Sequence, residues 1–217
     1  KKARILSFYV QKILEMEKEV KGRNLNLGDL KKENTALVVV DMVNGFVHEG
    51  VLASPRIKGI IKNIADLNNS TLGYKKIFFL DEHEEDSIEY KTHGIHCKRG
   101  TKECELIPEL KENLIVMIPK NSTNGFHAPL FKNWLSENEN TIENYIVVGC
   151  EVDICVINFA VTLKTYFNQK NMDRRIIVPA DSVETYDLES HDGDLMKIIS
   201  LYNMQMNGIE IVDSIII

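Results

Sequence analysis

The sequence predicts an α/β fold, a three-layer α/β/α sandwich around a central, mainly parallel sheet of about six strands. Two observations predict it. Short runs of β-branched and aromatic residues alternate along the chain with longer segments of helical periodicity. The short runs are apolar at successive positions, which is typical of strands buried on both faces. Strands of this kind that alternate with helices form parallel sheets covered on both sides.

The first segment, residues 1–33, is predicted to be an amphipathic helical extension. Its apolar residues, among them Ile5, Tyr9 and Ile13, fall near helical spacing between lysines and glutamates, and Gly22 breaks the pattern. We expect the helix to mediate contacts in a homo-oligomer. Residues 34–217 are predicted to form one domain, because no linker or repeat divides them.

Six strands and four helices are predicted in that domain. The expected strands are Ala36–Val40, Lys76–Leu80, Leu114–Ile118, Tyr145–Val148, Arg175–Val178 and Glu210–Val212. The expected helices are Ile57–Asn69, Leu130–Asn138, Cys155–Gln169 and Leu195–Met204.

Composition and charge exclude several classes of protein. The chain has 217 residues and a formal net charge of −6, whereas a nucleic-acid-binding domain usually carries a basic face. No apolar run approaches the roughly 20 residues of a membrane span. The four cysteines form no CxxC pair, which predicts free thiols in a cytoplasmic protein. We therefore expect neither nucleic acid nor membrane as a partner.

Side chains that follow the strands are the first candidates for function, because open parallel sheets bind ligands at the carboxyl ends of their strands. Asp41 follows the first strand, Asp81 and His83 the second, and Lys120 the third. The loop after the fourth strand leads to Cys155.

Cys155 is the candidate nucleophile. It comes after a turn that contains Gly149, and we expect it in the first turn of the next helix. The helix dipole there lowers the pKa of a thiol and raises its thiolate fraction. The alternative is an inert buried cysteine, which is the usual state of a free thiol.

Asp41 and Lys120 are candidates for acid–base and electrostatic roles. A carboxylate directly after five apolar residues is expected to have a charged or hydrogen-bonding partner, or a function that requires it. As a general base, Asp41 could take the thiol proton and later deliver it to a leaving amine. Each residue alone could instead be a turn-forming aspartate or a solvated lysine. Three such residues at equivalent ends of different strands favour a shared site.

The segment after the second strand, DEHEEDSIEYKTHGIHC, carries a candidate metal site. Asp81 and His83 stand two positions apart, so in an extended chain their side chains share a face. Glu89, His93 and His96 follow within the segment. Carboxylates and imidazoles suit zinc, iron or manganese, and open positions could hold water or a substrate ring nitrogen. The alternative is an acidic surface loop with scattered histidines.

These residues stand in motifs that resemble those of the isochorismatase-like cysteine hydrolases, and among them the nicotinamidases. The resemblance covers Thr35 to Val212. The family's aspartate motif DxxNxF is DMVNGF here, its lysine lies in PKNSTNGF, and its cysteine motif GxxxDxCV is GCEVDICV. The resemblance implies a catalytic triad of Asp41, Lys120 and Cys155.

The resemblance also implies the surroundings of the triad. A cis peptide between Cys150 and Glu151 would turn the backbone NH of Glu151 toward that of Cys155, forming an oxyanion hole. Phe46 and Phe126 would form apolar walls of the substrate pocket, with ordinary core packing as the alternative.

For the metal, the resemblance implies one divalent ion, with zinc ahead of iron or manganese. Its ligands would be Asp81, His83, Glu89 and His96. Nicotinamidases usually have a further histidine shortly after the Asp-x-His pair, where this chain has acidic and serine residues. Glu89 would take that role, and whether Glu89 or His93 completes the site stays open.

The resemblance implies deamidation of nicotinamide to nicotinic acid and ammonia. Cys155 would form a thioester, Asp41 would act as base and acid, and Lys120 would be the electrostatic partner. One alternative is hydrolysis of another small amide or a ureide by the same triad. Another is a non-catalytic member of the family that binds a ligand.

Overall fold

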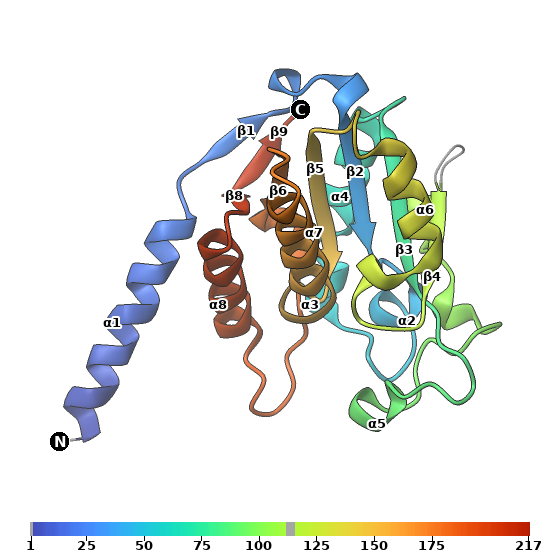
Figure 1. The fold of residues 1–217 in the computed structure, drawn as a ribbon. Coiled ribbons are helices and arrows are strands. Elements are labelled where there is room, and N and C mark those ends of the chain that lie inside the picture. The colour runs from blue at the N-terminus through green and yellow to red at the C-terminus, as the bar shows by residue number, and fades with distance from the viewer. Residues whose placement is uncertain (1, 112–115) are drawn as a thin grey trace.

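The computed structural model describes residues 2–111 and 116–217, which fold around a central seven-stranded sheet with helices on both faces (Figure 1). Six strands follow the order β4-β3-β2-β5-β6-β8, while β7 pairs with the end of β5. All of these pairings are parallel. The strands are β2 (Thr35–Val40), β3 (Lys75–Asp81), β4 (Val116–Lys120), β5 (Asn144–Cys150), β6 (Arg175–Pro179), β7 (Val183–Glu184) and β8 (Glu210–Val212). The predicted α/β/α sandwich is confirmed.

The helices vary widely in length. The α-helices are α1 (Lys2–Val20), α2 (Asn44–Val47), α3 (Pro55–Lys58), α4 (Ile61–Ser70), α5 (Tyr90–His93), α6 (Pro129–Asn138), α7 (Ile157–Gln169) and α8 (Gly193–Met206). Short 3₁₀ turns are η1 (Leu27–Asp29), η2 (Lys32–Asn34), η3 (Lys102–Cys104), η4 (Pro108–Leu110), η5 (Gly125–His127) and η7 (Ala180–Ser182). A π-helical turn, η6 (Val152–Val156), directly precedes α7.

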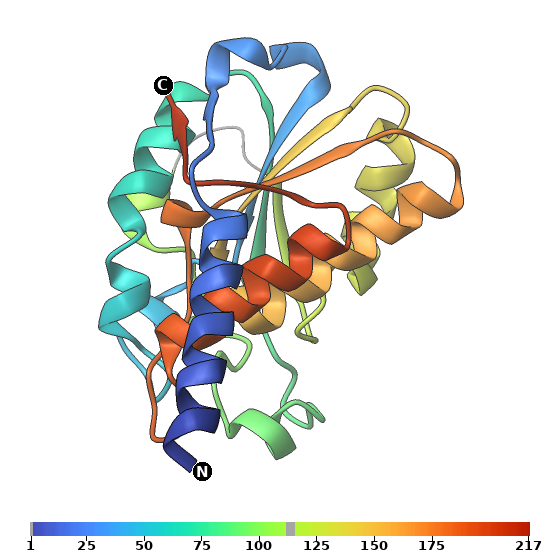
Figure 2. The same ribbon diagram turned by 90° about the vertical axis from the view of Figure 1, so that its left-hand side faces the viewer.

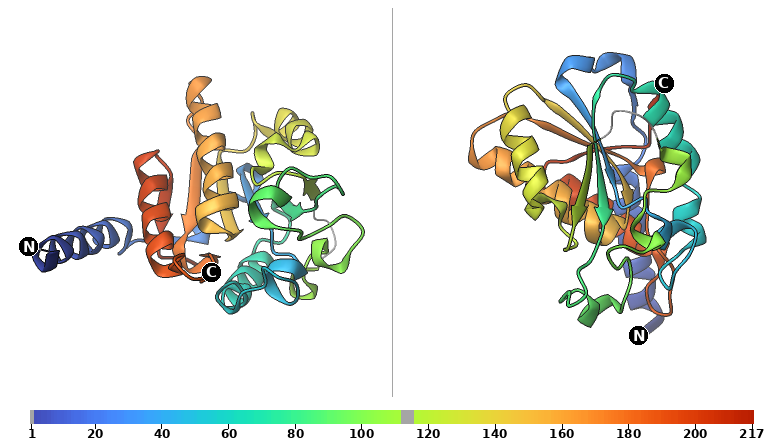
Figure 3. Two further views of the ribbon diagram at one scale, coloured as in Figure 1. Left: turned by 90° about the horizontal axis from the view of Figure 1, so that it is seen from below. Right: turned by 90° about the vertical axis from the view of Figure 1, so that its right-hand side faces the viewer.

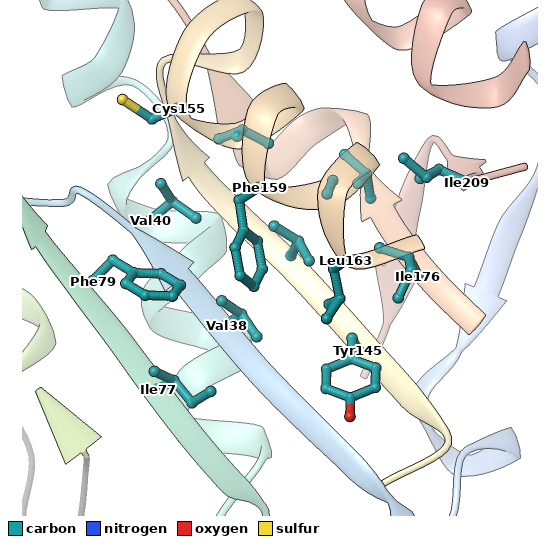
Figure 4. Close-up of a cluster of buried hydrophobic side chains, with 14 of the residues drawn as sticks. Val38, Val40, Ile77, Phe79, Tyr145, Cys155, Phe159, Leu163, Ile176 and Ile209 are labelled. Carbon is teal, nitrogen blue, oxygen red and sulfur yellow. The ribbon is translucent and has the colours of Figure 1, made fainter. Parts of the chain in front are cut away.

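Alternate side chains of the strands enter two cores, because successive residues of a strand point to opposite faces. Val38 and Val40 of β2 belong to the same core as residues of α6, α7 and α8. Figure 4 shows both valines beside Phe159 and Leu163 of α7. Leu37 and Val39 of the same strand pack with residues of α2, α3 and α4. Figure 3 shows the helices on either side of the sheet from two further directions. This burial on both faces explains the apolar runs in the sequence.

The predicted elements differ from the observed ones mainly at their ends. The helix expected over Ile57–Asn69 is divided into α3 and α4. The strand expected over Leu114–Ile118 begins outside the described residues, and β4 continues to Lys120. The two-residue strand β7 is the seventh member of a sheet predicted to have about six.

The N-terminal extension is α-helical only over α1, with short 3₁₀ turns at η1 and η2, so the prediction of one helical segment over residues 1–33 was too long. Gly22 follows α1 with φ of +94°, a conformation that glycine adopts without steric cost. Residues Asn24–Asn26 then form β1, which pairs in parallel with β9 (Ser214–Ile216) near the other end of the chain. Figure 2 shows α1 crossing α8 on one side of the molecule. Among the described residues, no helix is long and apolar enough to span a membrane.

Candidate active site

A cavity of about 50 Å³ lies beyond the carboxyl ends of β3 and β5. It is lined by Phe46, Leu52, Asp81, His83, Glu89, His93, His96, Thr123, Glu151, Ile154, Cys155 and Tyr186. These residues come from five separate parts of the chain, and they include the candidate nucleophile and the candidate metal ligands. The sheet therefore brings both predicted centres to one place.

Lys120 lies at the centre of the charged groups. It ends β4 directly beside Asp81, which ends β3, because the two residues are register partners in the sheet. The Lys120 Nζ atom lies 2.6 Å from Asp81 Oδ1 and 2.8 Å from Asp41 Oδ2. It also lies 3.8 Å from the Sγ atom of Cys155. One ammonium group therefore contacts two carboxyl groups and one thiol. The fold thus brings the predicted triad of Asp41, Lys120 and Cys155 together.

Asp41 is fully buried just beyond β2, and its backbone NH donates a 3.1 Å hydrogen bond to Phe79 O. Its φ of +53° lies in the left-handed region, which aspartate tolerates better than most residues. Burial raises the pKa of the Asp41 carboxyl to about 6, although the charge of Lys120 opposes this rise. A carboxylate with such a pKa is suited to general acid–base work near neutral pH.

Cys155 lies in η6, the π-helical turn, rather than in the first turn of a regular helix. Its side chain is only 5% exposed, and Figure 4 shows its sulfur directed away from Phe159 and the other packed side chains. Burial raises the pKa of this thiol well above its ordinary value, while Lys120 acts in the opposite direction. The expectation of a lowered thiol pKa was therefore wrong, because desolvation of the thiolate outweighs the helix end and the lysine. A thiol in this state needs a base beside it.

Three candidate metal ligands converge within the cavity. Asp81 Oδ2 lies 2.9 Å from His83 Nε2 and 3.1 Å from His96 Nε2, and the two Nε2 atoms lie 3.1 Å apart. Ligand atoms at metal bonds of about 2.0–2.1 Å in a tetrahedral site are separated by roughly 3.3 Å. The three buried donor atoms thus have nearly the spacing that a divalent cation requires.

The other ring nitrogen of each imidazole, Nδ1, also has a hydrogen-bond partner, as is usual for histidines that bind a metal. The Nδ1 atom of His96 lies 2.8 Å from Gly94 O, and that of His83 lies 3.2 Å from Asn121 Oδ1. Because these oxygens accept hydrogen bonds, Nδ1 is the protonated nitrogen when each ring is neutral, and Nε2 is then the nitrogen that can bind a cation. Asp81, His83 and His96 therefore fit a divalent metal.

Glu89 lines the cavity but does not belong to this three-residue cluster. Its Oε1 atom accepts a 3.2 Å hydrogen bond from the backbone NH of Thr123. His93 also lines the cavity, with its ring centroid 6.1 Å from that of His96. A fourth ligand from Glu89 or His93 stays a prediction.

The two phenylalanines predicted to form pocket walls have different positions. Phe46 lines the cavity, with its ring centroid 6.0 Å from that of His96. Phe126 is not among the lining residues. Its ring packs against Phe131 and Tyr166, at centroid distances of 5.6 Å and 5.4 Å, beside the core under α6 and α7. Phe126 therefore has the packing role that was the alternative at the sequence level.

The backbone before the nucleophile has the shape that the resemblance implies. The peptide bond between Cys150 and Glu151 is cis. The carbonyl oxygen of Glu151 accepts hydrogen bonds from Ile154 N and Val156 N at 3.1 Å and 3.0 Å, which fixes this residue against η6. Gly149 has φ of +116°, and a Cβ atom there would lie 2.0 Å from Val40 O. Only glycine lets β5 approach β2 so closely at this point.

Another aromatic residue of the cavity wall, Tyr186, could not be recognised from the sequence. Tyr186 lines the cavity, and its ring stacks on that of His191 at a centroid distance of 4.0 Å. The Nε2 atom of His191 in turn lies 2.7 Å from Asp153 Oδ2. Asp153 was recognisable from the cysteine motif, whereas Tyr186 and His191 belong to a loop without periodicity.

Residues 35–208 match the model of the isochorismatase domain family. Nicotinamidase 1 of Arabidopsis thaliana is 28% identical, with 85% of this chain and 88% of the relative covered.

Solved structures share the fold. N-carbamoylsarcosine amidase from Thermoplasma acidophilum superposes with a TM-score of 0.68 at 26% identity, covering 83% of this chain and 96% of the other. A pyrazinamidase of Pyrococcus horikoshii in complex with zinc has a TM-score of 0.66 at 21% identity, covering 82% and 98%. The chain therefore belongs to the isochorismatase-like hydrolase family, with a nicotinamidase among its relatives there.

Proposed function

We propose that the protein is a metal-dependent amidohydrolase that converts nicotinamide to nicotinic acid and ammonia. The observation that carries the proposal is the contact of Lys120 with both Asp41 and Asp81. Through this contact, the residues of the triad and the Asp81–His83–His96 cluster form one continuous site around one cavity. The similarity to a plant nicotinamidase supports nicotinamide as the substrate.

The triad residues have distinct roles in this proposal. Asp41 accepts the proton of the Cys155 thiol, and the sulfur attacks the carboxamide carbon. The backbone NH groups of Glu151 and Cys155 stabilise the oxyanion. Asp41 returns the proton to the leaving ammonia, which breaks the C–N bond and leaves a thioester on Cys155. Asp41 then activates the water that releases the acid.

Lys120 keeps these charges in place, because its ammonium group contacts the base, the nucleophile and Asp81. A divalent metal bound by Asp81, His83 and His96 would supply a Lewis acid that anchors the pyridine nitrogen. We propose zinc as this metal, ahead of iron or manganese. Phe46 provides an apolar wall for the ring.

The test is release of ammonia from nicotinamide by the purified protein, with and without a chelator. We expect turnover that is lost on chelation and restored by added zinc. Cys155→Ala should abolish turnover in either condition, because it removes the nucleophile without adding bulk. No turnover of nicotinamide by metal-loaded protein would overturn the proposal, and turnover unaffected by the chelator would overturn the role of the metal.

The second candidate is hydrolysis of another small amide or a ureide by the same triad. It is favoured by the structural similarity to N-carbamoylsarcosine amidase. Ammonia release from N-carbamoyl amino acids, measured beside nicotinamide, separates the two candidates. A third candidate, a non-catalytic ligand-binding protein, requires that Cys155→Ala leave its function intact.

A further inference from the structure

Glu151 lines the cavity, and its carboxyl group has no part in the reaction proposed above, which uses only its backbone NH. The residue is 5% exposed, and its Oε2 atom is buried without a hydrogen-bond partner among the residues that the structure describes. A buried polar atom normally has a partner, because leaving it unpaired is unfavourable. An unpaired carboxyl oxygen on a residue that lines a cavity therefore points to a ligand.

Glu151 is held close to the nucleophile Cys155. Its backbone is fixed by the hydrogen bonds that its carbonyl oxygen accepts from Ile154 N and Val156 N, on either side of Cys155. Glu151 and Cys155 line the same cavity, whereas His83 and His96 line it from the segment after β3. A substrate whose reacting carbonyl carbon contacts Cys155 must place that carbonyl group beside Glu151.

The charge state of Glu151 defines what it can bind. Burial raises the pKa of the Glu151 carboxyl well above its ordinary value, and the neighbouring Asp153 and Asp41 raise it further. A neutral carboxyl offers one O–H donor and one carbonyl acceptor. These two groups are complementary to a primary carboxamide, which presents N–H donors and a carbonyl oxygen.

On the basis of the proposed function, we propose that the Glu151 side chain binds the carboxamide nitrogen of the substrate and so selects primary amides over esters of the same acid. At the reacting carbon, the substrate oxygen is bound by the backbone NH groups of the oxyanion hole. The nitrogen is the remaining polar atom there, and its N–H can donate to the Glu151 carboxyl. An ester has no such donor.

The experiment compares kcat/KM for nicotinamide with kcat/KM for methyl nicotinate in metal-loaded wild type, Glu151→Gln and Glu151→Met. Both variants keep the length of the side chain and the backbone NH, but only Gln keeps hydrogen-bonding groups. We expect the amide-to-ester ratio to fall about tenfold or more in Glu151→Met, because a site built to bind an N–H loses this preference when the acceptor is removed. In Glu151→Gln the ratio should stay within about threefold of wild type.

Two controls separate this role from a merely structural one. Leu52→Ala changes another side chain of the cavity wall and should shift both substrates together. Glu151→Ala removes the carboxyl without adding a new side chain and should show the same fall as Glu151→Met, which provides a second test if the Met variant does not fold. An unchanged ratio in Glu151→Met or Glu151→Ala would overturn the inference, as would an equal fall in Glu151→Gln. Failure of wild type to hydrolyse nicotinamide would instead overturn the proposed function.

Discussion

At the scale of single residues, Lys120 holds two buried carboxylates together, with Nζ within 2.8 Å of both Asp41 and Asp81. Lys120→Met keeps most of the side-chain volume and removes the charge. The two carboxylates would then share a buried site without a counter-charge. Removing one partner of a buried ion pair costs about 3–5 kcal/mol, so we expect the free energy of unfolding to fall by about that amount in urea titrations of metal-free protein.

The matched control for Lys120→Met is the double variant with Asp41→Asn, which also removes one of the two carboxylate charges left without a counter-charge. We expect the double variant to be more stable than Lys120→Met alone, since the lost interaction is shared by the two residues. Lys98→Met, at an exposed ion pair with Glu85, should change stability little. A double variant as unstable as the sum of the two single variants would contradict this account of Lys120.

The pKa of Asp41 predicts how activity depends on pH. Burial raises this pKa to about 6, and Asp41 must be ionised to accept the thiol proton. As pH falls through this value, Asp41 becomes protonated and the base is lost. We expect kcat/KM for nicotinamide to be level near pH 7–8 and to fall about tenfold per pH unit below about pH 6. A profile of metal-saturated enzyme that is level down to about pH 4 would contradict the role of Asp41 as base.

The sequence was sufficient to predict the positions of Asp41, Lys120 and Cys155, because each follows or ends a strand of strongly apolar character. It did not predict the orientation of Phe126, since an aromatic ring near a strand end can pack into a core or into a cavity. The pKa of Cys155 also could not be predicted, because it depends on burial by residues distant in the sequence. Tyr186 and His191 lie in an irregular loop, and only the folded chain brings them to the site.

At the scale of secondary-structure elements, the approach of β5 to β2 depends on Gly149. In Gly149→Ala the new Cβ would lie 2.0 Å from Val40 O, in a backbone conformation with φ of +116°. Both the backbone strain and the displacement of β2 are unfavourable. We expect a loss of at least about 3 kcal/mol in the free energy of unfolding, measured by chemical denaturation.

Gly22→Ala is the control for this substitution. Gly22 also has a positive φ, +94°, but a Cβ there would have no atom within 4 Å. Only the backbone strain is then added, which costs about 1–2 kcal/mol. Equal losses in the two variants would show that the close contact with β2 is not what requires glycine at position 149.

The core strands and long helices could be predicted from the sequence because their periodicity reflects burial directly. Other elements have no such signal. The two-residue β7 is too short to show a pattern, and β1 and β9 are three-residue strands that exist only because distant segments pair. The turn η6 resembles the start of an ordinary helix in sequence, although its backbone is π-helical where Cys155 lies.

At the scale of the whole molecule, α1 presents an apolar surface to solvent. Phe8, Tyr9, Val10 and Leu14 are each at least 50% exposed, although α1 also packs on α8 (Figure 2). We propose that this surface contacts a second copy of the chain. We expect the double variant Val10→Lys, Leu14→Lys to have a lower molar mass than wild type in analytical ultracentrifugation, because a lysine is costly to bury in an apolar interface.

Lys12→Ala, on the same helix, controls for general effects on α1, because Lys12 is half-exposed and its described contacts, with Glu15 and the Phe8 ring, stay within the helix. This variant should keep the mass of wild type. A double lysine variant with unchanged mass would contradict the oligomer contact, as would a wild-type chain that sediments as a monomer.

The pairing of β1 with β9 also has a consequence for the order in which the chain folds during synthesis. Asn24 and Ser214, which are partners in this small sheet, are 190 positions apart. During synthesis, α1 and β1 leave the ribosome long before α8 and β9 are made. The apolar side chains of α1 that contact α8 therefore have no surface to pack on until α8 has been made. In that interval, these apolar side chains are exposed and open to binding by a chaperone.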